Sequence, residues 1–290
     1  MKGNVLVTGA DGFVGRHLCA LLHANDFEVI GAMRSDESAY EDCPYRIVTV
    51  GDIGETVDWQ AHLSGVDFVV HLASRVHVMR EVANDPLYEF RRVNVFGSEQ
   101  LLSSMDSGQI ERFVYVSTIK VYSERSSNMP ISVRDELQPQ DPYSLSKYEA
   151  ELKVENLAGE KGIPFTIIRP PLVYGPGVGG NFLRLMNLVE RGVPLPLGRV
   201  QNQRSMVGVQ NLCDLIHESL VNERAKNRRL LVSDNDDIST PDLIRRISTA
   251  LSKRDQVFSF PLGLLKTAGV LLGRRPEFDR LVESLVVDVS

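Results

Sequence analysis

A tyrosine and a lysine stand four residues apart in the segment Tyr143-Ser144-Leu145-Ser146-Lys147. On a helix this spacing projects both side chains from one face. An ammonium beside a phenol stabilises the phenolate, so we expect the pKa of this tyrosine to fall from about 10 towards neutrality. Such a tyrosine exchanges a proton with a hydroxyl or carbonyl group. Because the same spacing also occurs in exposed helical neighbours, the pair needs support from other residues.

A threonine upstream gives that support. The apolar run 112–117 has the pattern of a buried strand, and Ser117 and Thr118 lie at its end. Ligands of open parallel sheets bind beyond the carboxyl ends of the strands. We therefore predict that Thr118 polarises the same substrate oxygen on which Tyr143 acts.

A glycine-rich turn precedes the first amphipathic run, with the sequence Thr8-Gly9-Ala10-Asp11-Gly12-Phe13-Val14-Gly15. Glycines allow a tight turn and close approach of the backbone to a pyrophosphate, and a helix N-terminus offers amide donors to it. The alternative, glycines that only make a turn, is disfavoured by the context of strand, turn and helix. The motif predicts a dinucleotide site.

The end of the second strand bears on which dinucleotide binds. Its sequence, Gly31-Ala32-Met33-Arg34-Ser35, lacks the acid that often binds the ribose 2′-hydroxyl about 20 residues past the glycines. Arg34, assisted by Arg16, offers guanidinium donors to a 2′-phosphate, which favours NADP(H) over NAD(H). The alternative is that Arg34 stacks on the adenine or is solvated. Asp52 is placed either to accept from the adenine amino group or to cap the next turn.

Short apolar runs and longer amphipathic runs alternate through the first 170 residues. We predict strands at 4–8, 28–33, 46–50, 68–72, 112–117 and 165–169, and helices at 12–25, 59–64, 87–105 and 143–162. This alternation predicts an α/β fold with a Rossmann-type, doubly wound parallel sheet. Beyond Arg169, prolines and glycines interrupt the pattern. The expected domains are a dinucleotide-binding domain over 1–170 and a smaller, mainly substrate-binding region over 171–290, interleaved with the first.

Composition excludes several classes of protein. The 290 residues are 43% hydrophobic and 24% charged, as in ordinary globular chains, and the formal charge of -6 disfavours nucleic acid or anionic membrane as a partner. Three scattered cysteines and a start without a signal-peptide pattern predict a cytoplasmic protein. The apolar segment 258–273 contains Pro261 and Lys266 and is shorter than about 20 residues, which favours a buried or interfacial helix over a membrane span.

Together the motifs resemble the extended short-chain dehydrogenase/reductase family, particularly its NAD-dependent epimerase/dehydratase branch of nucleotide-sugar 4-epimerases and 4-ketoreductases. The resemblance spans nearly the whole chain. The matching pieces occur in the family's order at 8–15, 52–53, 71–73, 94–97, 117–118, 143–147 and 169–177.

The resemblance implies a set of site residues. Thr118, Tyr143 and Lys147 form its catalytic triad. Asn94 supports a water or the active-site helix, and His71 and His77 are interpreted as structural, so no metal site is predicted. The predicted cofactor-binding residues are Gly9, Gly12, Phe13, Val14, Gly15, Arg34, Asp52, Ile53, Leu72, Ala73, Ser74, Asn94, Ser117, Tyr143, Lys147, Pro170 and Leu172.

The implied substrate is a UDP-sugar of bacterial surface-polysaccharide (O-antigen, lipopolysaccharide) synthesis. Asn181, Arg204 and Arg280 match positions that bind the nucleoside diphosphate, and Thr118 and Tyr143 face the sugar. The alternative for each arginine is a surface ion pair. The resemblance also implies a homodimer, joined through the helices that carry Asn94 and Tyr143, and a C-terminus truncated relative to the family.

Two reactions at C4 of the sugar fit these residues. The 2′-phosphate argument at Arg34 favours reduction of a UDP-4-keto-6-deoxy-hexosamine, and the alternative is 4-epimerisation of a UDP-hexose or UDP-N-acetylhexosamine. Dehydration is disfavoured because Ile119-Lys120 follow Thr118, where the family's dehydratases often have Asp-Glu. A non-enzymatic alternative, a dinucleotide-sensing regulator, is disfavoured by the presence of all three triad residues.

Overall fold

The computed structural model describes residues 2–35, 43–76, 85–126, 129–271 and 275–290. They form two compact units. The first comprises Met1–Ser123, Glu136–Pro170 and Val209–Val232, and the second comprises Glu124–Asp135, Pro171–Gly208 and Ser233–Ser290. The division predicted after residue 170 coincides with one of these boundaries, and the chain crosses between the units at several further points.

The first unit is built on a parallel sheet of seven described strands in the order β3-β2-β1-β4-β5-β6-β9. This arrangement confirms the predicted fold class. The inner strands are almost continuously apolar and buried, because helices cover both faces of the sheet. The strands are β1 (Asn4–Thr8), β2 (Glu28–Met33), β3 (Arg46–Thr49), β4 (Phe68–His71), β5 (Arg112–Val116), β6 (Phe165–Arg169) and β9 (Arg228–Leu231).

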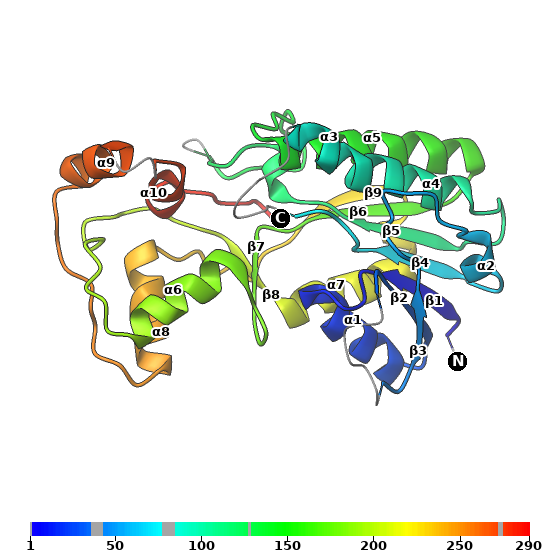
Figure 1. The fold of residues 1–290 in the computed structure, drawn as a ribbon, viewed down its shortest axis with the longest axis horizontal. Helices are drawn as coiled ribbons and strands as arrows, with labels where there is room; N and C mark the ends of the chain where they lie inside the picture. Colours follow the sequence, from blue (N-terminus) through cyan, green and yellow to red (C-terminus); the bar gives the residue numbers. More distant parts are fainter. Residues whose placement is uncertain (1, 36–42, 77–84, 127–128, 272–274) are drawn as a thin grey trace. The chain divides into compact units, whose positions relative to one another are not determined.

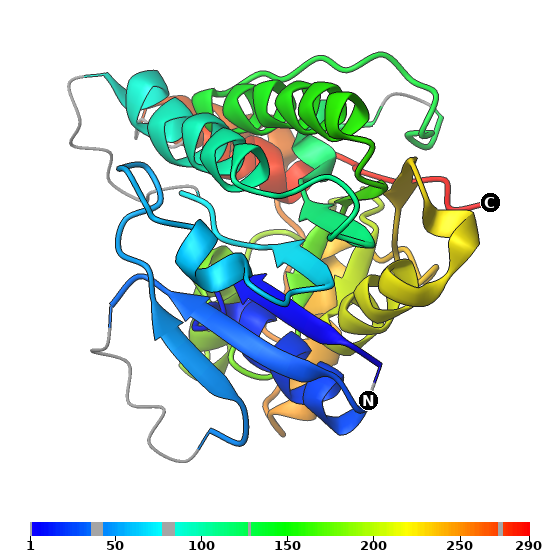
Figure 2. The same ribbon diagram turned by 90° about the vertical axis from the view of Figure 1, so that its right-hand side faces the viewer.

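Helices α1 (Phe13–Ala24) and α7 (Val209–Val221) pack against each other on one face of the sheet, as Figures 1 and 2 show. The other face carries α5 (Pro142–Lys161) and a long helical segment that was predicted as one helix over 87–105. That segment consists of α3 (Pro86–Arg91), the π-helical turn η1 (Arg92–Phe96) and α4 (Gly97–Ser103). Short turns complete this unit at α2 (Gln60–Leu63), η2 (Ile119–Val121) and η3 (Glu223–Ala225).

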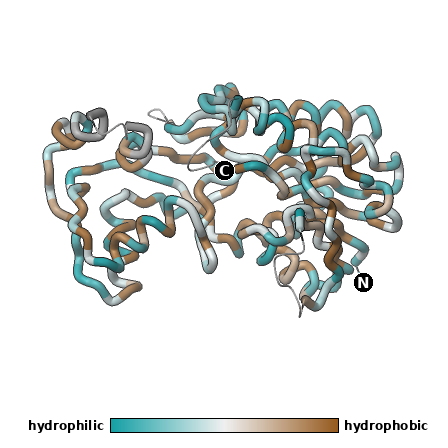
Figure 3. Tube along the Cα trace, in the orientation of Figure 1, coloured by the Kyte–Doolittle hydropathy of each residue, from teal (hydrophilic) through white to brown (hydrophobic). Residues whose placement is uncertain are grey.

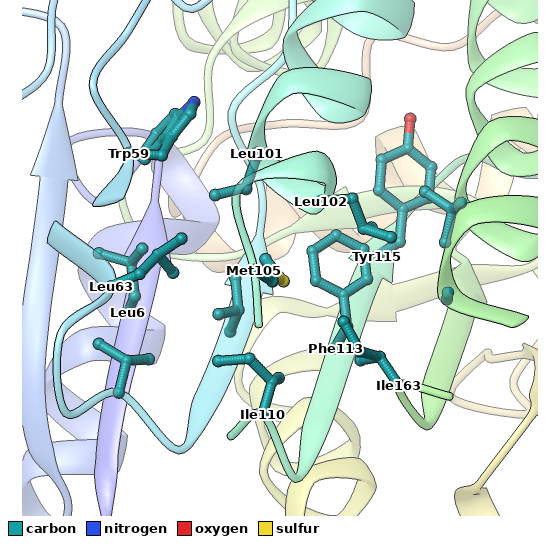
Figure 4. Close-up of a cluster of buried hydrophobic side chains, with 14 of the residues drawn as sticks. Leu6, Trp59, Leu63, Leu101, Leu102, Met105, Ile110, Phe113, Tyr115 and Ile163 are labelled. Atoms are coloured by element: carbon teal, nitrogen blue, oxygen red, sulfur yellow. The ribbon is translucent and has the colours of Figure 1, made fainter. Parts of the chain in front are cut away.

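A buried hydrophobic cluster of the first unit lies between the sheet and the α4–α5 layer. In Figure 4, Phe113 and Tyr115 of β5 face Leu102 of α4, and the Tyr115 hydroxyl points away from Phe113. Figure 3 shows the hydrophobic strands of the sheet and the mixed polarity of the helices over it. Burial of this apolar surface fixes the sheet, and with it the strand ends that precede the site.

The second unit contains a two-stranded parallel sheet of β7 (Leu172–Tyr174) and β8 (Met206–Gly208). Its apolar cluster joins Val189 and Leu195 to Ile244 and Ile247. Its helices are α6 (Gly180–Glu190), α8 (Thr240–Ala250), α9 (Leu262–Leu271) and α10 (Arg275–Val282). No helix in the described part of the chain has the length and apolarity needed to cross a bilayer.

Candidate active site

The glycine-rich turn joins β1 to α1 with little room for side chains. Gly9 has a φ of +69°, and a Cβ on it would lie 2.9 Å from the backbone nitrogen of Ala73. A Cβ on Gly15 would lie 2.1 Å from the Gly9 carbonyl oxygen, so only glycine permits this close packing of helix against turn. A Cβ on Gly12 would meet only that same oxygen, at 3.1 Å.

The start of α1 fits a phosphate group. Gly12 is its N-cap and provides no side-chain cap, so the first-turn amides of Phe13, Val14 and Gly15 have no partner within the helix. These donors and the positive end of the helix dipole are suited to a pyrophosphate. Nearby in the fold, at the end of β5, Ser117 Oγ is buried without a hydrogen-bond partner among the described residues. The residues present therefore fit a dinucleotide.

Asp52 caps the turn that follows it, which is one of its two predicted roles. Its Oδ1 accepts a 2.9 Å hydrogen bond from the Gly54 backbone nitrogen, and its Oδ2 accepts from Arg92 Nη2 at 2.9 Å. Burial opposes ionisation, but these two partners lower the pKa of the carboxyl below its usual value. Arg34, exposed beyond the end of β2, adds to this lowering. Ile53, next to Asp52, is buried.

The other predicted cofactor residues of the first unit follow strand ends. Leu72, Ala73 and Ser74 follow β4, Ser117 follows β5, and Pro170 follows β6. Since all strands of the sheet are parallel, these positions share its carboxyl edge. Leu172 begins β7 and belongs to the second unit.

His71 is a buried structural residue of this edge. Its Nδ1 lies 2.7 Å from Thr8 Oγ1 and its Nε2 lies 3.0 Å from Ser98 Oγ. Ser98 donates its own proton to the Asn94 carbonyl, so we assign the ring proton to Nε2. Burial, with a smaller effect of the Lys147 charge, lowers the pKa of His71 to about 3 and keeps the ring neutral. His77 lies outside the described residues.

Asn94 lies in the π-helical turn η1 and contacts the active-site helix. Its Nδ2 donates to Ser146 Oγ at 2.9 Å and to the Arg75 carbonyl at 3.0 Å, while its Oδ1 accepts from the Arg75 backbone nitrogen at 2.8 Å. Ser146 Oγ in turn donates to the Tyr143 carbonyl at 2.7 Å. A π-helical turn at this position is consistent with a functional site.

Tyr143 and Thr118 are brought together by α5 and the end of β5. Thr118 is close enough to the phenol to lower its pKa, and the Phe90 ring of α3 lies 5.9 Å from the Tyr143 ring. Burial of the phenol and the nearby Asp141 carboxylate raise the pKa of Tyr143 to about 12, against a smaller opposing effect of Thr118.

Lys147 is buried one turn further along α5. Its Nζ donates to the Val116 carbonyl at 2.9 Å and lies 4.1 Å from the centre of the Tyr115 ring. Burial lowers the pKa of Lys147 to about 7, although the Glu151 carboxylate opposes this shift. The predicted fall in the pKa of Tyr143 is therefore wrong. Burial of the phenol is the largest effect on this pKa, and Lys147 is only partly protonated near neutral pH.

Two ion pairs near the triad were missed by the sequence analysis. Lys120 pairs with Asp141, and Glu151 pairs with Arg169. The role of Asp141 as a helix cap was predictable from the sequence, because an Asp-Pro pair begins the helix and Ser144 completes a capping box. The pairings join residues 21 and 18 positions apart, and no local pattern indicates them.

The predicted substrate residues lie in the second unit. Asn181 is exposed in the first turn of α6. Arg204 Nη1 donates to the Glu283 carbonyl at 3.1 Å, so this side chain is tied to the C-terminal segment. Arg280 lies in α10, and its side chain is outside the described part of the structure.

Comparison with known proteins agrees with this geometry. Residues 5–232 match the NAD dependent epimerase/dehydratase family. A UDP-glucose 4-epimerase from Vibrio cholerae is 39% identical over 294 residues, which cover 100% of this chain and 88% of that protein. In a structure of UDP-glucuronic acid 4-epimerase from Bacillus cereus in complex with NAD, the match covers 99% of this chain and 90% of that one, with a TM-score of 0.79 and 21% identity.

A structure of UDP-glucose 4-epimerase from Thermotoga maritima with UDP-glucose has the same coverage, a TM-score of 0.77 and 22% identity. At this identity the two structures establish a common fold. The family match and the Vibrio cholerae relative go further, because together they span the whole chain. The chain therefore belongs to the NAD dependent epimerase/dehydratase family, whose members act with an NAD(P) dinucleotide.

Proposed function

We propose that this protein is a 4-epimerase of a UDP-hexose or UDP-N-acetylhexosamine. The observation that carries the proposal is that Thr118 interacts with the Tyr143 phenol and that buried Lys147 lies one helical turn away on α5. The 39% identity to a UDP-glucose 4-epimerase over the full chain supports epimerisation over the reductase reading. The reductase interpretation rests on Arg34, assisted by Arg16, as a donor to a 2′-phosphate.

The triad residues have separable roles in this proposal. Thr118 and Tyr143 bind the oxygen at C4 of the sugar, and Tyr143 takes and returns its proton. The dinucleotide, when bound, supplies the hydride acceptor and donor. Because the pKa of Tyr143 is about 12, it holds its proton at neutral pH and is ready to protonate the oxygen of a 4-keto sugar. Removing a proton from the C4 hydroxyl requires added positive charge near the phenol, which protonated Lys147 provides.

We further propose NAD(H) as the resident cofactor. The Bacillus cereus structure of the same fold contains NAD. A 4-epimerase returns the hydride to the sugar, so its dinucleotide is not consumed and does not have to be replaced by NADPH from solution. Arg34 remains the residue that would favour a 2′-phosphate. The nucleotide released from purified protein by denaturation, identified by chromatography, decides the point. Release of NADP(H), together with loss of retained nucleotide in Arg34→Ala, would overturn this assignment.

The predicted homodimer remains a proposal with support from exposed apolar side chains. Tyr88 of α3, Phe96 of η1 and Leu152 of α5 are 55%, 46% and 43% exposed on the helical layer that carries Asn94 and Tyr143. We expect a dimeric mass by light scattering and a monomeric one for Leu152→Glu. A monomeric wild type would exclude this interface. The cytoplasmic location and the role in surface-polysaccharide synthesis stay predictions.

The test of function is incubation of the protein with UDP-glucose, UDP-galactose or UDP-GlcNAc, without added nucleotide, followed by identification of the sugar product. We expect the C4 epimer to form, and Tyr143→Phe to reduce the rate by about 10²- to 10⁴-fold. Tyr148→Phe, the next tyrosine on α5, is the matched control and should retain activity.

Two other outcomes would replace the proposal. Oxidation of NADPH with a UDP-4-keto-6-deoxy-hexosamine, without epimerisation of any sugar, would establish the reductase. Dinucleotide binding without turnover of any nucleotide sugar would point to the sensing regulator.

A further inference from the structure

Lys120 and Asp141 form an ion pair beside the catalytic tyrosine. Lys120 Nζ lies 3.0 Å from Asp141 Oδ2, and both side chains are largely buried. Lys120 belongs to the turn η2, which directly follows Thr118, and Asp141 is the N-cap of α5, two residues before Tyr143. The pair therefore joins the two segments that carry the proton-transfer residues.

The two oxygens of Asp141 have different partners. Oδ1 accepts a 2.7 Å hydrogen bond from the Ser144 backbone nitrogen, which caps the helix, and Oδ2 binds Lys120. Thr118 Oγ1 accepts from the Lys120 backbone nitrogen at 3.3 Å, and Thr118 also lowers the pKa of the Tyr143 phenol. Lys120 thus links Thr118 to Asp141, and both of these residues shift the pKa of Tyr143.

The charges around Tyr143 make the Lys120–Asp141 ion pair electrostatically important for the phenol. Among the described residues, the titratable groups that interact with the phenol are Tyr115 on β5 and Asp141 at the N-cap of α5, and α3 contributes the uncharged Phe90 ring. Lys147 lies one helical turn further along α5, and Lys120 of η2 is paired with Asp141. Asp141 disfavours the phenolate. An ammonium bound to Asp141 offsets that effect, because opposite charges in contact cancel most of each other's field.

We propose that Lys120 is a positioning residue for proton transfer at Tyr143: its ion pair with Asp141 holds Thr118 against the phenol and neutralises the carboxylate at the start of α5. This inference rests on the proposed role of Tyr143. It also gives a physical reason for a lysine where the family's dehydratases often carry an acid, because Lys120 is engaged in charge compensation and takes no proton from the sugar.

Three variants separate this role from simple stabilisation. Lys120→Met removes the ammonium and keeps the length of the side chain. Asp141→Asn removes the carboxylate and keeps an oxygen able to cap α5. The double variant removes both charges, and Lys120→Arg, which keeps the cation, is the matched control.

The variants should change phenol ionisation in opposite directions. Lys120→Met leaves Asp141 uncompensated, so the pKa of Tyr143 rises and the acidic limb of the pH–rate profile moves to higher pH, by roughly one unit. Asp141→Asn moves that limb to lower pH, and the double variant and Lys120→Arg lie near wild type. At neutral pH we expect Lys120→Met to lower kcat about tenfold while KM changes little.

A second measurement needs no turnover. The phenolate absorbance of Tyr143, obtained by subtracting the matching Tyr143→Phe spectrum, is followed in dinucleotide-loaded protein up to the highest pH at which the protein stays folded. The expected order of phenolate content is Asp141→Asn above wild type and the double variant, with Lys120→Met lowest. Shifts of equal sign in the two single variants, or no shift in either, would overturn the proposal. If the order holds but no sugar is epimerised, the proposed function fails and the electrostatic role stands.

Discussion

Arg169 of β6 and Glu151 of α5 form a buried bidentate ion pair one helical turn beyond Lys147. Arg169 Nη2 donates to Glu151 Oε2 at 2.6 Å, and Nε donates to Oε1 at 3.1 Å. Arg169 also donates to the Tyr122 hydroxyl. The Glu151 carboxylate raises the pKa of Lys147 against the effect of burial. The pair therefore connects the central sheet to the charge state of the catalytic helix.

Breaking this pair should destabilise the protein strongly. In Glu151→Gln the Arg169 guanidinium stays buried without a counter-charge, which costs about 3–5 kcal/mol of unfolding free energy. Glu155, one turn further along α5, pairs with the half-exposed Arg229, so Glu155→Gln should cost at most about 1 kcal/mol. Denaturant unfolding of both variants measures the difference. Equal losses would mean that burial does not decide the contribution of these pairs.

The pH dependence of the free energy of unfolding should report the ionisation of the buried Lys147. The pKa of Lys147 is about 7 in the folded protein, against 10.5 for an ordinary lysine. Between these values the unfolded chain binds a proton that the folded protein releases. The free energy of unfolding therefore rises with pH across this window, by up to about 1.4 kcal/mol per pH unit.

Lys147→Met removes this titration and leaves the other alkaline groups in place. The measurement is the difference in unfolding free energy between wild type and Lys147→Met at a series of pH values from neutral to alkaline. We expect this difference to shift steadily in favour of wild type as pH rises. A difference that stays constant with pH would show that Lys147 keeps its proton in the folded protein.

Much of the fold and of the site was predictable because its signals are local. The glycine-rich turn, the apolar strands and the Tyr-Lys spacing each lie within a few residues, and the parallel order of the strands then places Ser117 and Thr118 at the carboxyl edge of the sheet. Strand β9 gave no such signal: its Arg228-Arg229-Leu230-Leu231 sequence is that of a half-exposed edge strand.

What the sequence could not predict depends on contacts between distant residues. The Tyr143 pKa is set by burial and by Asp141, and the sign of its shift follows from three-dimensional packing. The partners of Lys120 and Glu151 lie on other elements, and a charged residue in a sequence does not indicate which opposite charge it meets. The π-helical turn at Asn94 is also invisible to a periodicity of 3.6 residues.

Asn94 should contribute to both stability and catalysis. Asn94→Ala removes two hydrogen bonds with the Arg75 backbone and one with the Ser146 hydroxyl, which costs about 1–3 kcal/mol. Because Ser146 is bonded to the Tyr143 carbonyl, we also expect kcat to fall. Asn25→Ala, which removes one bond to the Leu21 carbonyl at the end of α1, is the control and should leave kcat unchanged. A normal kcat in Asn94→Ala would limit this residue to a structural role.

The glycine turn offers a pair of substitutions that separates folding from cofactor binding. In Gly15→Ala the new methyl group would lie 2.1 Å from the Gly9 oxygen and 2.8 Å from the Ala10 Cα, so the backbone must move and the protein should lose several kcal/mol or fail to fold. In Gly12→Ala only one contact, at 3.1 Å, must relax, and the fold should persist. The added methyl group nevertheless lies where α1 begins, in the path of an approaching pyrophosphate.

Thermal unfolding and the amount of nucleotide retained after purification distinguish the two variants. Gly12→Ala should unfold near the wild-type temperature yet retain little dinucleotide, and full retention would place the phosphates away from this turn.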